Sequence, residues 1–249
     1  MREALARPDR VVQIYATASA IERQRGLLDE VLAAGRPPLD VVSDKAAAAL
    51  SETVTPQGLV AVCRQVPARV DEVLGRAPRL LVVLVEPNEP GNVGAIVRTA
   101  DAAGADAVII SGGADPFSGK AVRASAGSLF HLPVAVVDGE ATATVLSDIV
   151  AAGLAILATS GRASADLDDL TADGTLERPT AWIFGNEAQG LSAEVVAAAS
   201  RSVRIPMYGR AESLNLAAAA AVCLYASARV LHRRSEHGAA LGEVTGSAG

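Results

Sequence analysis

Hydrophobic and polar positions follow two periods along most of this chain. Short runs rich in Val, Ile and Leu alternate with longer segments in which apolar residues recur every three or four positions, as in buried strands and amphipathic helices. The strand-like runs are LLVVLVE, AVIIS, PVAVV, LAILATS, TAWIF and VRIP. The helix-like segments are GAIVRTADAAG, ATVLSDIVAAG, AEVVAAAS and an Ala-rich stretch from about Leu214 to Arg233. The alternation predicts an α/β domain over residues 80–235, with a mostly parallel sheet covered by helices.

The rest of the chain divides into three shorter parts. Residues 1–65 alternate in the same way, through VVQIYAT, ERQRGLLDEVLAAG, DVVS, DKAAAALSE and GLVAVCR, which predicts a small α/β domain. Residues 66–79 are polar and bracketed by proline, which favours a linker containing a short helix. Residues 236–249 end in GEVTGSAG and predict a disordered tail.

Composition narrows the class of protein. Half of the 249 residues are hydrophobic but only 3% are aromatic, so Ala, Val, Leu and Ile must build the core. No apolar run reaches the roughly 18 residues of a membrane span, and the N-terminus has no apolar signal core, so we expect a cytoplasmic protein without a membrane partner. Cys63 and Cys223 form no CxxC or Cys/His pattern, so we expect reduced thiols and no metal.

Charge argues mildly against a nucleic-acid partner. The net charge is −6; residues 1–78 carry 10 basic and 10 acidic groups, whereas residues 79–249 carry 12 basic and 18 acidic groups. Proteins that bind phosphate backbones usually show a basic bias. An RNA-binding surface would therefore depend on a few local arginines in or beside loops, namely Arg98, Arg123, Arg162 and Arg210.

Common nucleotide and hydrolase motifs are excluded. GGADPFSGKA ends in Gly-Lys, but Ala114 and Ala121 occupy the P-loop positions that require Gly and Ser or Thr. No strand-like run is followed by GxGxxG, and the RASAG segment has Arg123 where a nucleophile elbow requires Gly. We expect the three histidines, His131, His232 and His237, to be structural or exposed.

Gly and Asn gather in three segments, each just after a strand-like run and before a helical one. The segments are NEPGNVGAIVRTA (88–100), IFGNEAQGL (183–191) and IPMYGRAESLNLAAA (205–219). Main-chain N–H groups and small side chains at such junctions can line a ligand pocket. Taken singly, the residues also have structural explanations: Ser213 or Asn92 could cap a helix, Gly94 could allow close packing, and Glu187 could be a solvated acid at a helix start.

Taken together, the three segments resemble the SpoU, or TrmH-like, family of the SPOUT RNA 2′-O-ribose methyltransferases in letters, order and spacing. The family pattern Asn-x-Gly-x-x-x-Arg is met by Asn92, Gly94 and Arg98. Its second pattern is met by Gly185, Asn186, Glu187 and Gly190. Its third is met by Ile205, Pro206, Met207, Ser213, Leu214 and Asn215. The resemblance covers about residues 80–233.

The resemblance implies a fold and a cofactor. The family has a deep trefoil knot, here expected over about Leu154 to Asn215, and forms a homodimer through the knotted domain, with Arg98 of the partner subunit completing each site. S-adenosylmethionine is the implied cofactor. The residues implied to bind it are Thr159, Ser160, Gly161, Gly185, Asn186, Glu187, Gly190, Ile205, Pro206, Met207, Ser213, Leu214 and Asn215.

The resemblance also implies catalytic and RNA-binding residues. The catalytic set is Arg98, Asn92, Glu187, Ser213 and Asn215, and the RNA-binding set is Arg98, Arg123, Ser125 and Arg210. An arginine keeps its proton at a pKa above about 12, so we interpret Arg98 first as orienting the ribose and stabilising developing oxyanion charge. The other four would hold Arg98 and the ribose in register.

The first domain resembles the later part of the L30e-like substrate-binding domain of these enzymes, including TPQGLVAV at 55–62. In relatives that domain begins earlier, so we expect it to be N-terminally shortened here. The implied reaction is methylation of a ribose 2′-hydroxyl, with 23S ribosomal RNA as the first expectation and transfer RNA as the second. A member of the fold that binds S-adenosylmethionine and RNA without catalysis, and a small-molecule α/β enzyme, stay open as alternatives.

Overall fold

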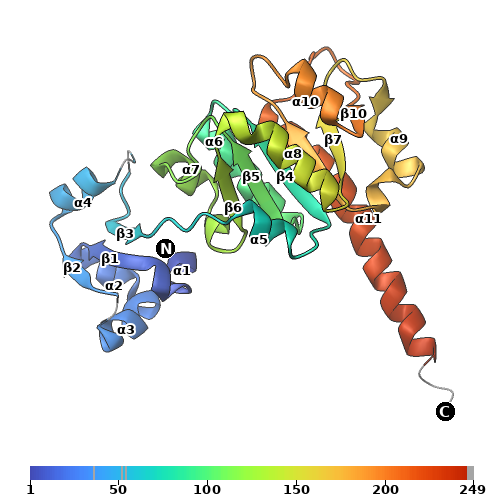
Figure 1. Ribbon diagram of the computed structural model, residues 1–249. Coiled ribbons are helices and arrows are strands. Elements are labelled where there is room, and N and C mark those ends of the chain that lie inside the picture. Colours follow the sequence, from blue (N-terminus) through green and yellow to red (C-terminus); the bar gives the residue numbers. More distant parts are fainter. Residues whose placement is uncertain (36, 52, 54, 246–249) are drawn as a thin grey trace. The chain divides into compact units, whose positions relative to one another are not determined.

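The computed structural model describes residues 1–35, 37–51, 53 and 55–245, and the chain divides into two units, Met1–Val66 and Pro67–Gly249 (Figure 1). The division lies one residue from the first predicted boundary. From Pro67 on, the predicted linker belongs to the second unit, because Ala68 pairs with Ala135 and a short helix, α5 (Val70–Leu74), packs there. Within the described residues, no helix is long and apolar enough to span a membrane.

The first unit is a three-stranded sheet with short helices. Strand β1 (Val11–Ala16) lies in the middle, parallel to β2 (Leu39–Val41) and antiparallel to β3 (Leu59–Cys63). The helices are α1 (Arg2–Leu5), η1 (Pro8–Arg10), α2 (Ala18–Arg23), α3 (Arg25–Ala34) and α4 (Asp44–Leu50). Ile14 and Leu28 are fully buried, so even this small sheet has an apolar core.

The second unit contains a seven-stranded sheet in the order β6-β5-β4-β9-β7-β10-β8, and every pair in it is parallel. This confirms the predicted parallel sheet. The strands are β4 (Leu80–Val85), β5 (Ala107–Ser111), β6 (Val134–Val137), β7 (Ala155–Thr159), β8 (Ala165–Asp166), β9 (Thr180–Phe184) and β10 (Arg201–Arg204). Strand β9 follows β7 and β8 along the chain but lies between β4 and β7 in the sheet, which brings its loop beside the loop after β4.

Helices cover both faces of this sheet. Alternate residues of a strand point to opposite faces, so Leu80, Val82 and Leu84 join one hydrophobic cluster while Leu81 and Val83 join the other. The first cluster includes residues of α6 (Pro90–Ala102), α9 (Leu167–Ala172) and α11 (Leu216–Thr245). The second includes residues of α5, α8 (Thr142–Ala151) and α10 (Ala193–Ala198). The remaining elements are α7 (Gly119–Ala124), which packs on α6, and the 3₁₀ turns η2 (Ser128–Phe130), η3 (Gly139–Ala141) and η4 (Thr175–Glu177).

Helix α11 is longer than the sequence predicted. It begins at Leu216, two residues after the expected start, and continues to Thr245, into the segment 236–249 that was predicted as a disordered tail; residues 246–249 lie outside the described residues. Ala239, Ala240 and Leu241 are strong helix formers, whereas a glycine inside a helix costs only about 1 kcal/mol, so the helix can continue through this segment. Nearer its start the helix is anchored by the buried indole N–H of Trp182, which donates to Ser227 Oγ over 2.9 Å.

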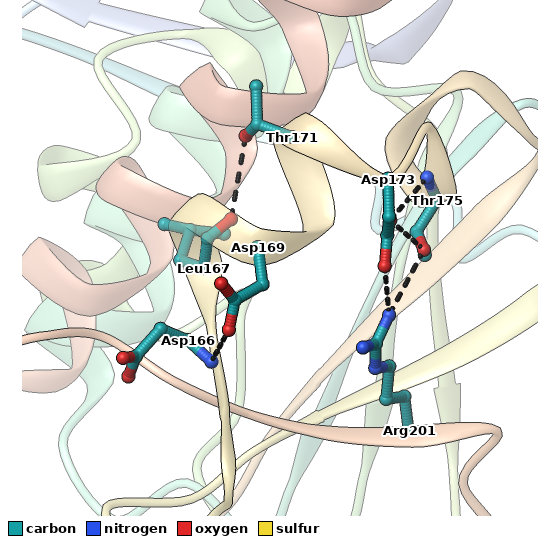
Figure 2. Close-up of polar contacts among 7 residues, drawn as sticks. All are labelled: Asp166, Leu167, Asp169, Thr171, Asp173, Thr175 and Arg201. Carbon is teal, nitrogen blue, oxygen red and sulfur yellow. Dashed lines mark hydrogen bonds and ion pairs between the residues drawn. The ribbon is translucent and has the colours of Figure 1, made fainter.

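Polar contacts anchor β10 to the segment that contains α9 and η4 (Figure 2). Asp173 accepts hydrogen bonds from Thr175 and from Arg201, at the start of β10, and the first of these is the larger cause that lowers its pKa to about 2. Arg204, at the other end of β10, donates from Nε to Asp166 Oδ1 over 2.7 Å. Because the strand is held at both ends, the loop that follows it starts from a fixed position.

Candidate functional site

The Gly- and Asn-rich segments meet at one edge of the large sheet. In a parallel sheet the carboxyl ends of all strands lie on the same edge, where open α/β sheets bind their ligands. The loops after β4 and β9 are adjacent there because these strands pair, and the loops after β7 and β10 are adjacent for the same reason. Most of the candidate residues predicted from the sequence lie in these four loops or directly after them, and the topology explains why the loops converge.

The loop after β4 is a tight turn that leads into α6. Glu86 has a φ of +49°, a left-handed conformation that is strained for any residue other than glycine. Glu89 caps α6 by accepting from the N–H of Gly91 over 3.1 Å, with Pro90 in the first helical turn. Its carboxylate also pairs with Lys120 over 2.7 Å. Asn92 is therefore not the helix cap that one structural explanation had proposed, and its amide is available for other contacts.

The loop after β9 closes on itself. A Cβ at Gly185 would lie 2.3 Å from the carbonyl carbon of Gly190, so the position requires glycine. Asn186 fastens the turn from inside, because its Oδ1 accepts from the N–H of Ala188 over 2.9 Å and of Gln189 over 3.3 Å. Its Nδ2 donates to the carbonyl oxygen of Glu86 over 2.9 Å, which joins this loop to the turn after β4.

Glu187 is the centre of a hydrogen-bond network between these loops. Its Oε1 accepts from Asn92 Nδ2 and its Oε2 from the main-chain N–H of Asn88, each over 2.9 Å. Partial burial acts to raise the pKa of the Glu187 carboxyl, but the accepted hydrogen bonds outweigh it and hold the pKa below its usual value. The carboxylate is thus an ionised acceptor with both oxygens engaged, which suits a residue that holds its neighbours in place.

Asn215 joins the third segment to this network. Its Nδ2 donates to Asn92 Oδ1 over 3.2 Å, while its Oδ1 caps α11 by accepting from the N–H of Ala218 over 2.8 Å. The cap of the Ala-rich helix is therefore Asn215 and not Ser213, which the structural explanation had favoured. Ser213 is exposed and lies in the loop before the helix.

Arg98 stands apart from the network. It is exposed on α6, and among the described residues it has no hydrogen bond or ion pair. The expectation that Asn92, Glu187, Ser213 and Asn215 hold Arg98 is therefore not met within one chain. Gly94, from the same motif, allows close packing, since a Cβ there would lie 2.1 Å from the carbonyl oxygen of Ala121 on α7.

Beside the network lies a cavity of about 450 Å³ between the loops after β7 and β10. Eight residues predicted to bind the cofactor line it: Thr159, Ser160, Gly161, Ile205, Pro206, Met207, Ser213 and Leu214. Four further residues line the cavity but were not predicted from the sequence: Val203, Arg204, Glu212 and Ala219. The other five predicted cofactor residues, Gly185, Asn186, Glu187, Gly190 and Asn215, are not part of this lining. Asn186 and Gly190 line a separate cavity of about 600 Å³.

The predicted RNA-binding residues are placed unequally. Arg123 and Arg210 are exposed. Ser125 is fully buried, and its hydroxyl donates to the carbonyl oxygen of Val122 over 2.8 Å, so it offers no surface to RNA and that prediction is corrected. Ser125 follows the end of α7, where its side chain turns inward. In the described part of the chain, no group of three or more His, Cys, Asp or Glu side chains could hold a metal ion.

Asn88 was not among the predicted site residues, although it contacts two of them. Its main-chain N–H binds Glu187, and its Nδ2 donates to Asn186 Oδ1 over 3.1 Å. The signal in the sequence was an asparagine between Pro87 and the cap residue Glu89, directly after a strand. That position is typical of turns, and only the structure brings the loop after β9 against it.

Comparisons with known proteins match both units. Residues 79–225 match the SpoU rRNA Methylase family, and residues 1–68 match a domain described as RNA 2′-O ribose methyltransferase substrate binding. The 23S rRNA (guanosine(2553)-2′-O)-methyltransferase RlmP of Bacillus subtilis is 36% identical over 186 residues, which is 74% of this chain and 70% of that protein. The 23S rRNA (guanosine-2′-O-)-methyltransferase RlmB of Bordetella pertussis is 32% identical over 89% of this chain and 90% of that protein.

Solved structures agree with these matches. The SpoU methyltransferase AviRb from Streptomyces viridochromogenes, in complex with the cofactor AdoMet, superposes with a TM-score of 0.79 at 31% identity, covering 92% of this chain and 87% of that one. An AdoMet-bound rRNA methyltransferase from Sinorhizobium meliloti superposes with a TM-score of 0.78 at 30% identity, covering 92% of this chain and 84% of that one.

Proposed function

Because this chain belongs to the SpoU rRNA methylase family, we propose that it transfers the methyl group of S-adenosylmethionine to a ribose 2′-hydroxyl of RNA, with 23S ribosomal RNA as the substrate. The observation that carries the proposal is the position of the Asn92–Glu187–Asn215 network beside the cavity lined by the predicted cofactor residues. Named relatives that methylate 23S ribosomal RNA support the choice of substrate.

The cavity fits the cofactor in size and chemistry. Its volume of about 450 Å³ lies within the roughly 300–1,000 Å³ of small-ligand sites. Ile205, Met207 and Leu214 offer apolar contact for an adenine ring, and the carboxylate of Glu212 can accept from ribose hydroxyls. When bound there, S-adenosylmethionine supplies a methyl group already activated by its sulfonium sulfur.

The protein's own contribution is placement and charge. As the 2′-oxygen bonds to the methyl carbon, the carbon–sulfur bond breaks and the hydroxyl proton leaves. Arg98 orients the ribose–phosphate and stabilises the negative charge that develops on the oxygen. Because the guanidinium stays protonated, proton removal falls to another acceptor, for which the RNA phosphate is available. Asn92 and Asn215, fixed by Glu187, keep the ribose in line with the methyl group.

The active unit in this proposal is a homodimer in which Arg98 enters the partner's site. Among the described residues Arg98 has no hydrogen bond or ion pair within its own chain, as expected for a residue that serves another subunit. Helix α11 exposes Val222 and Tyr225, to 40% and 47%, and apolar side chains of this kind are available to a second copy. We further propose that the loop following β10 forms part of the trefoil knot of the family.

The first unit and the exposed arginines complete the proposal. We assign RNA binding to residues 1–68, and to Arg98, Arg123 and Arg210 in the second unit, since these arginines are exposed on a unit that is otherwise acidic. Recognition of an RNA loop through shape and phosphate needs few positive side chains if they are well placed. The cytoplasm, where ribosomal RNA lies, is the compartment that this function requires.

The direct test is transfer of labelled methyl from S-adenosylmethionine to deproteinised ribosomal and transfer RNA in separate reactions, followed by nuclease digestion. We expect label on a ribose 2′-oxygen of 23S ribosomal RNA. Label on transfer RNA alone would replace the substrate. Binding of S-adenosylmethionine without transfer to any RNA would instead identify a non-catalytic member of the family.

A further inference from the structure

Asn88 contacts both polar residues of the loop after β9. Its main-chain N–H donates to Glu187 Oε2 over 2.9 Å, and its side-chain Nδ2 donates to Asn186 Oδ1 over 3.1 Å. From these contacts we propose that Asn88 is a positioning residue for methyl transfer, which holds this loop in the orientation that presents Glu187 to Asn92. The inference rests on the proposed function and adds to it a residue that is not one of the family-pattern positions Asn92, Gly94 and Arg98.

The turn that carries Asn88 is rigid. Glu86 adopts its left-handed conformation, which costs of the order of 1–3 kcal/mol for a residue with a side chain, and Pro87 fixes the next φ. The N–H of Ala114 donates to the carbonyl oxygen of Pro87 over 2.7 Å. A Cβ at Gly113 would lie 2.5 Å from that same oxygen, so the neighbouring loop packs directly against the turn. Asn88 is therefore presented from a fixed backbone.

The direction of the hydrogen bond between Asn88 and Asn186 is determined by other groups. Asn186 Oδ1 also accepts from the N–H groups of Ala188 and Gln189, and Nδ2 of the same amide donates to Glu86. Rotating this amide by half a turn would place a donor against two donors and an acceptor against a carbonyl oxygen. Asn186 therefore presents an acceptor to position 88, where a donor fits and a second acceptor would be repelled.

Asn88→Asp is the sharpest variant because aspartate has the shape of asparagine but no donor. Its carboxylate would face the side-chain oxygen Oδ1 of Asn186 and would add a negative charge near Glu187. Asn88→Ala removes the donor without adding charge. We expect kcat to fall about 10- to 100-fold in Asn88→Asp and less in Asn88→Ala, the scale seen when reacting groups are misplaced by about an ångström.

The affinity for S-adenosylmethionine distinguishes a positioning role of Asn88 from general damage to the fold. Asn88 does not line the cofactor cavity, so the Kd for S-adenosylmethionine, measured by calorimetry, should stay within about twofold of wild type in both variants. Thr171→Ala is the matched control, since it also removes a single side-chain hydrogen bond, to Leu167 on α9 (Figure 2), and it should keep wild-type kcat. Unchanged kcat in Asn88→Asp, or a loss of cofactor affinity as large as the loss of kcat, would overturn the proposal.

Hydrogen exchange provides a readout that needs no activity. In the wild type the N–H groups of Ala188 and Gln189 are bonded to Asn186, and in Asn88→Asp they should exchange faster. Equal exchange in the two proteins would contradict the positioning role. A wild-type protein that methylates no RNA would sink the proposed function, whereas the exchange comparison would still decide whether Asn88 holds the loop.

Discussion

Asn215 Nδ2 donates a hydrogen bond to Asn92 Oδ1 over 3.2 Å, and this contact joins the start of the last helix to the first turn of α6. The two residues are 123 positions apart in the sequence. The amide of Asn215 has two separate tasks, because its oxygen caps α11 through the N–H of Ala218 while its nitrogen holds Asn92. Helix stability and site geometry therefore depend on the same side chain.

Two substitutions at Asn215 should separate these tasks. Asn215→Asp keeps an oxygen for the cap but loses the donor to Asn92, so we expect the thermal midpoint to be retained and kcat to fall by about two orders of magnitude. Asn215→Ala loses both the cap of α11 and the donor to Asn92, and it should also lower the free energy of unfolding by about 1 kcal/mol. Thermal unfolding and methyl transfer on the same samples check this. Wild-type turnover in both variants would remove Asn215 from the proposed site.

Arg98→Ala should cut methyl transfer by two or more orders of magnitude while leaving the fold and cofactor binding intact. Arg98 is exposed and does not line the cavity, so its loss removes charge stabilisation and not packing. Calorimetry with S-adenosylmethionine and the transfer assay measure the two effects separately. Arg76→Ala, which removes another exposed arginine of the same unit, is the control for general loss of charge.

If Arg98 serves the partner subunit, mixed dimers give a second check. A dimer of Arg98→Ala and Asn215→Ala subunits would contain one site with both intact residues. Mixing the two inactive variants should then restore part of the activity, and a mixture that stays inactive although exchange of subunits is demonstrated would argue that Arg98 acts within its own chain.

Much of the second unit was predictable because its signals are local. The strand-like run at Leu80 to Val85 forms β4, and the predicted parallel order follows from the alternation of strands and helices. Residues 159–161, 205–207, 213 and 214, which the family resemblance implied as cofactor-binding residues, line one cavity. In these cases the residues that determine the structure are close together in the sequence.

The parts that could not be predicted depend on contacts between distant segments. Where the incoming loop ends decides whether Ser213 or Asn215 caps α11. Asn215 is the cap, and its side-chain nitrogen also donates to Asn92, a contact between distant segments that the sequence does not reveal. Glu212 enters the cavity through the path of the loop after β10, which no motif marks. Asn88 is recognised only once β9 is known to insert between β4 and β7.

Glu187→Gln tests whether this residue works as an ionised acceptor. One oxygen of the carboxylate becomes an NH₂ group, which must then face either Asn92 Nδ2 or the N–H of Asn88, and both are donors. We expect kcat to fall at least tenfold with little change in cofactor affinity, since Glu187 lies outside the cavity lining. Equal kcat in Glu187→Gln and wild type would show that methyl transfer does not depend on Glu187 accepting hydrogen bonds from both Asn92 and Asn88.

Gly185→Ala should disrupt the loop after β9 by steric clash. The added Cβ would lie 2.4 Å from the carbonyl oxygen of Gly190 and 2.6 Å from the nitrogen of Leu191, and both are backbone atoms that cannot rotate away. We expect a loss of about 1–3 kcal/mol or more in the free energy of unfolding, as for other overpacked sites. Gly26→Ala is the control, because a Cβ there meets nothing within 4 Å, and denaturant unfolding of both variants gives the comparison.

Asp173 should make the stability of the second unit depend on acid pH. Its hydrogen bonds from Thr175 and Arg201 lower its pKa in the folded protein from 3.8 to about 2. A carboxyl group with a lowered folded pKa adds stability that is fully present above its unfolded pKa and is lost as the pH falls through the folded value. The contribution should therefore be present above about pH 4 and vanish near pH 2, and salt should weaken it because the pair is partly exposed.

The thermal midpoint of Asp173→Asn should lie below that of wild type at neutral pH and converge with it on acidification. Asp148→Asn, at an exposed position on α8, is the control, and parallel curves for wild type and Asp173→Asn would contradict the assignment. Because Arg201 begins the strand that leads into the cofactor loop, the same variant should also weaken binding of S-adenosylmethionine at neutral pH, which calorimetry can measure.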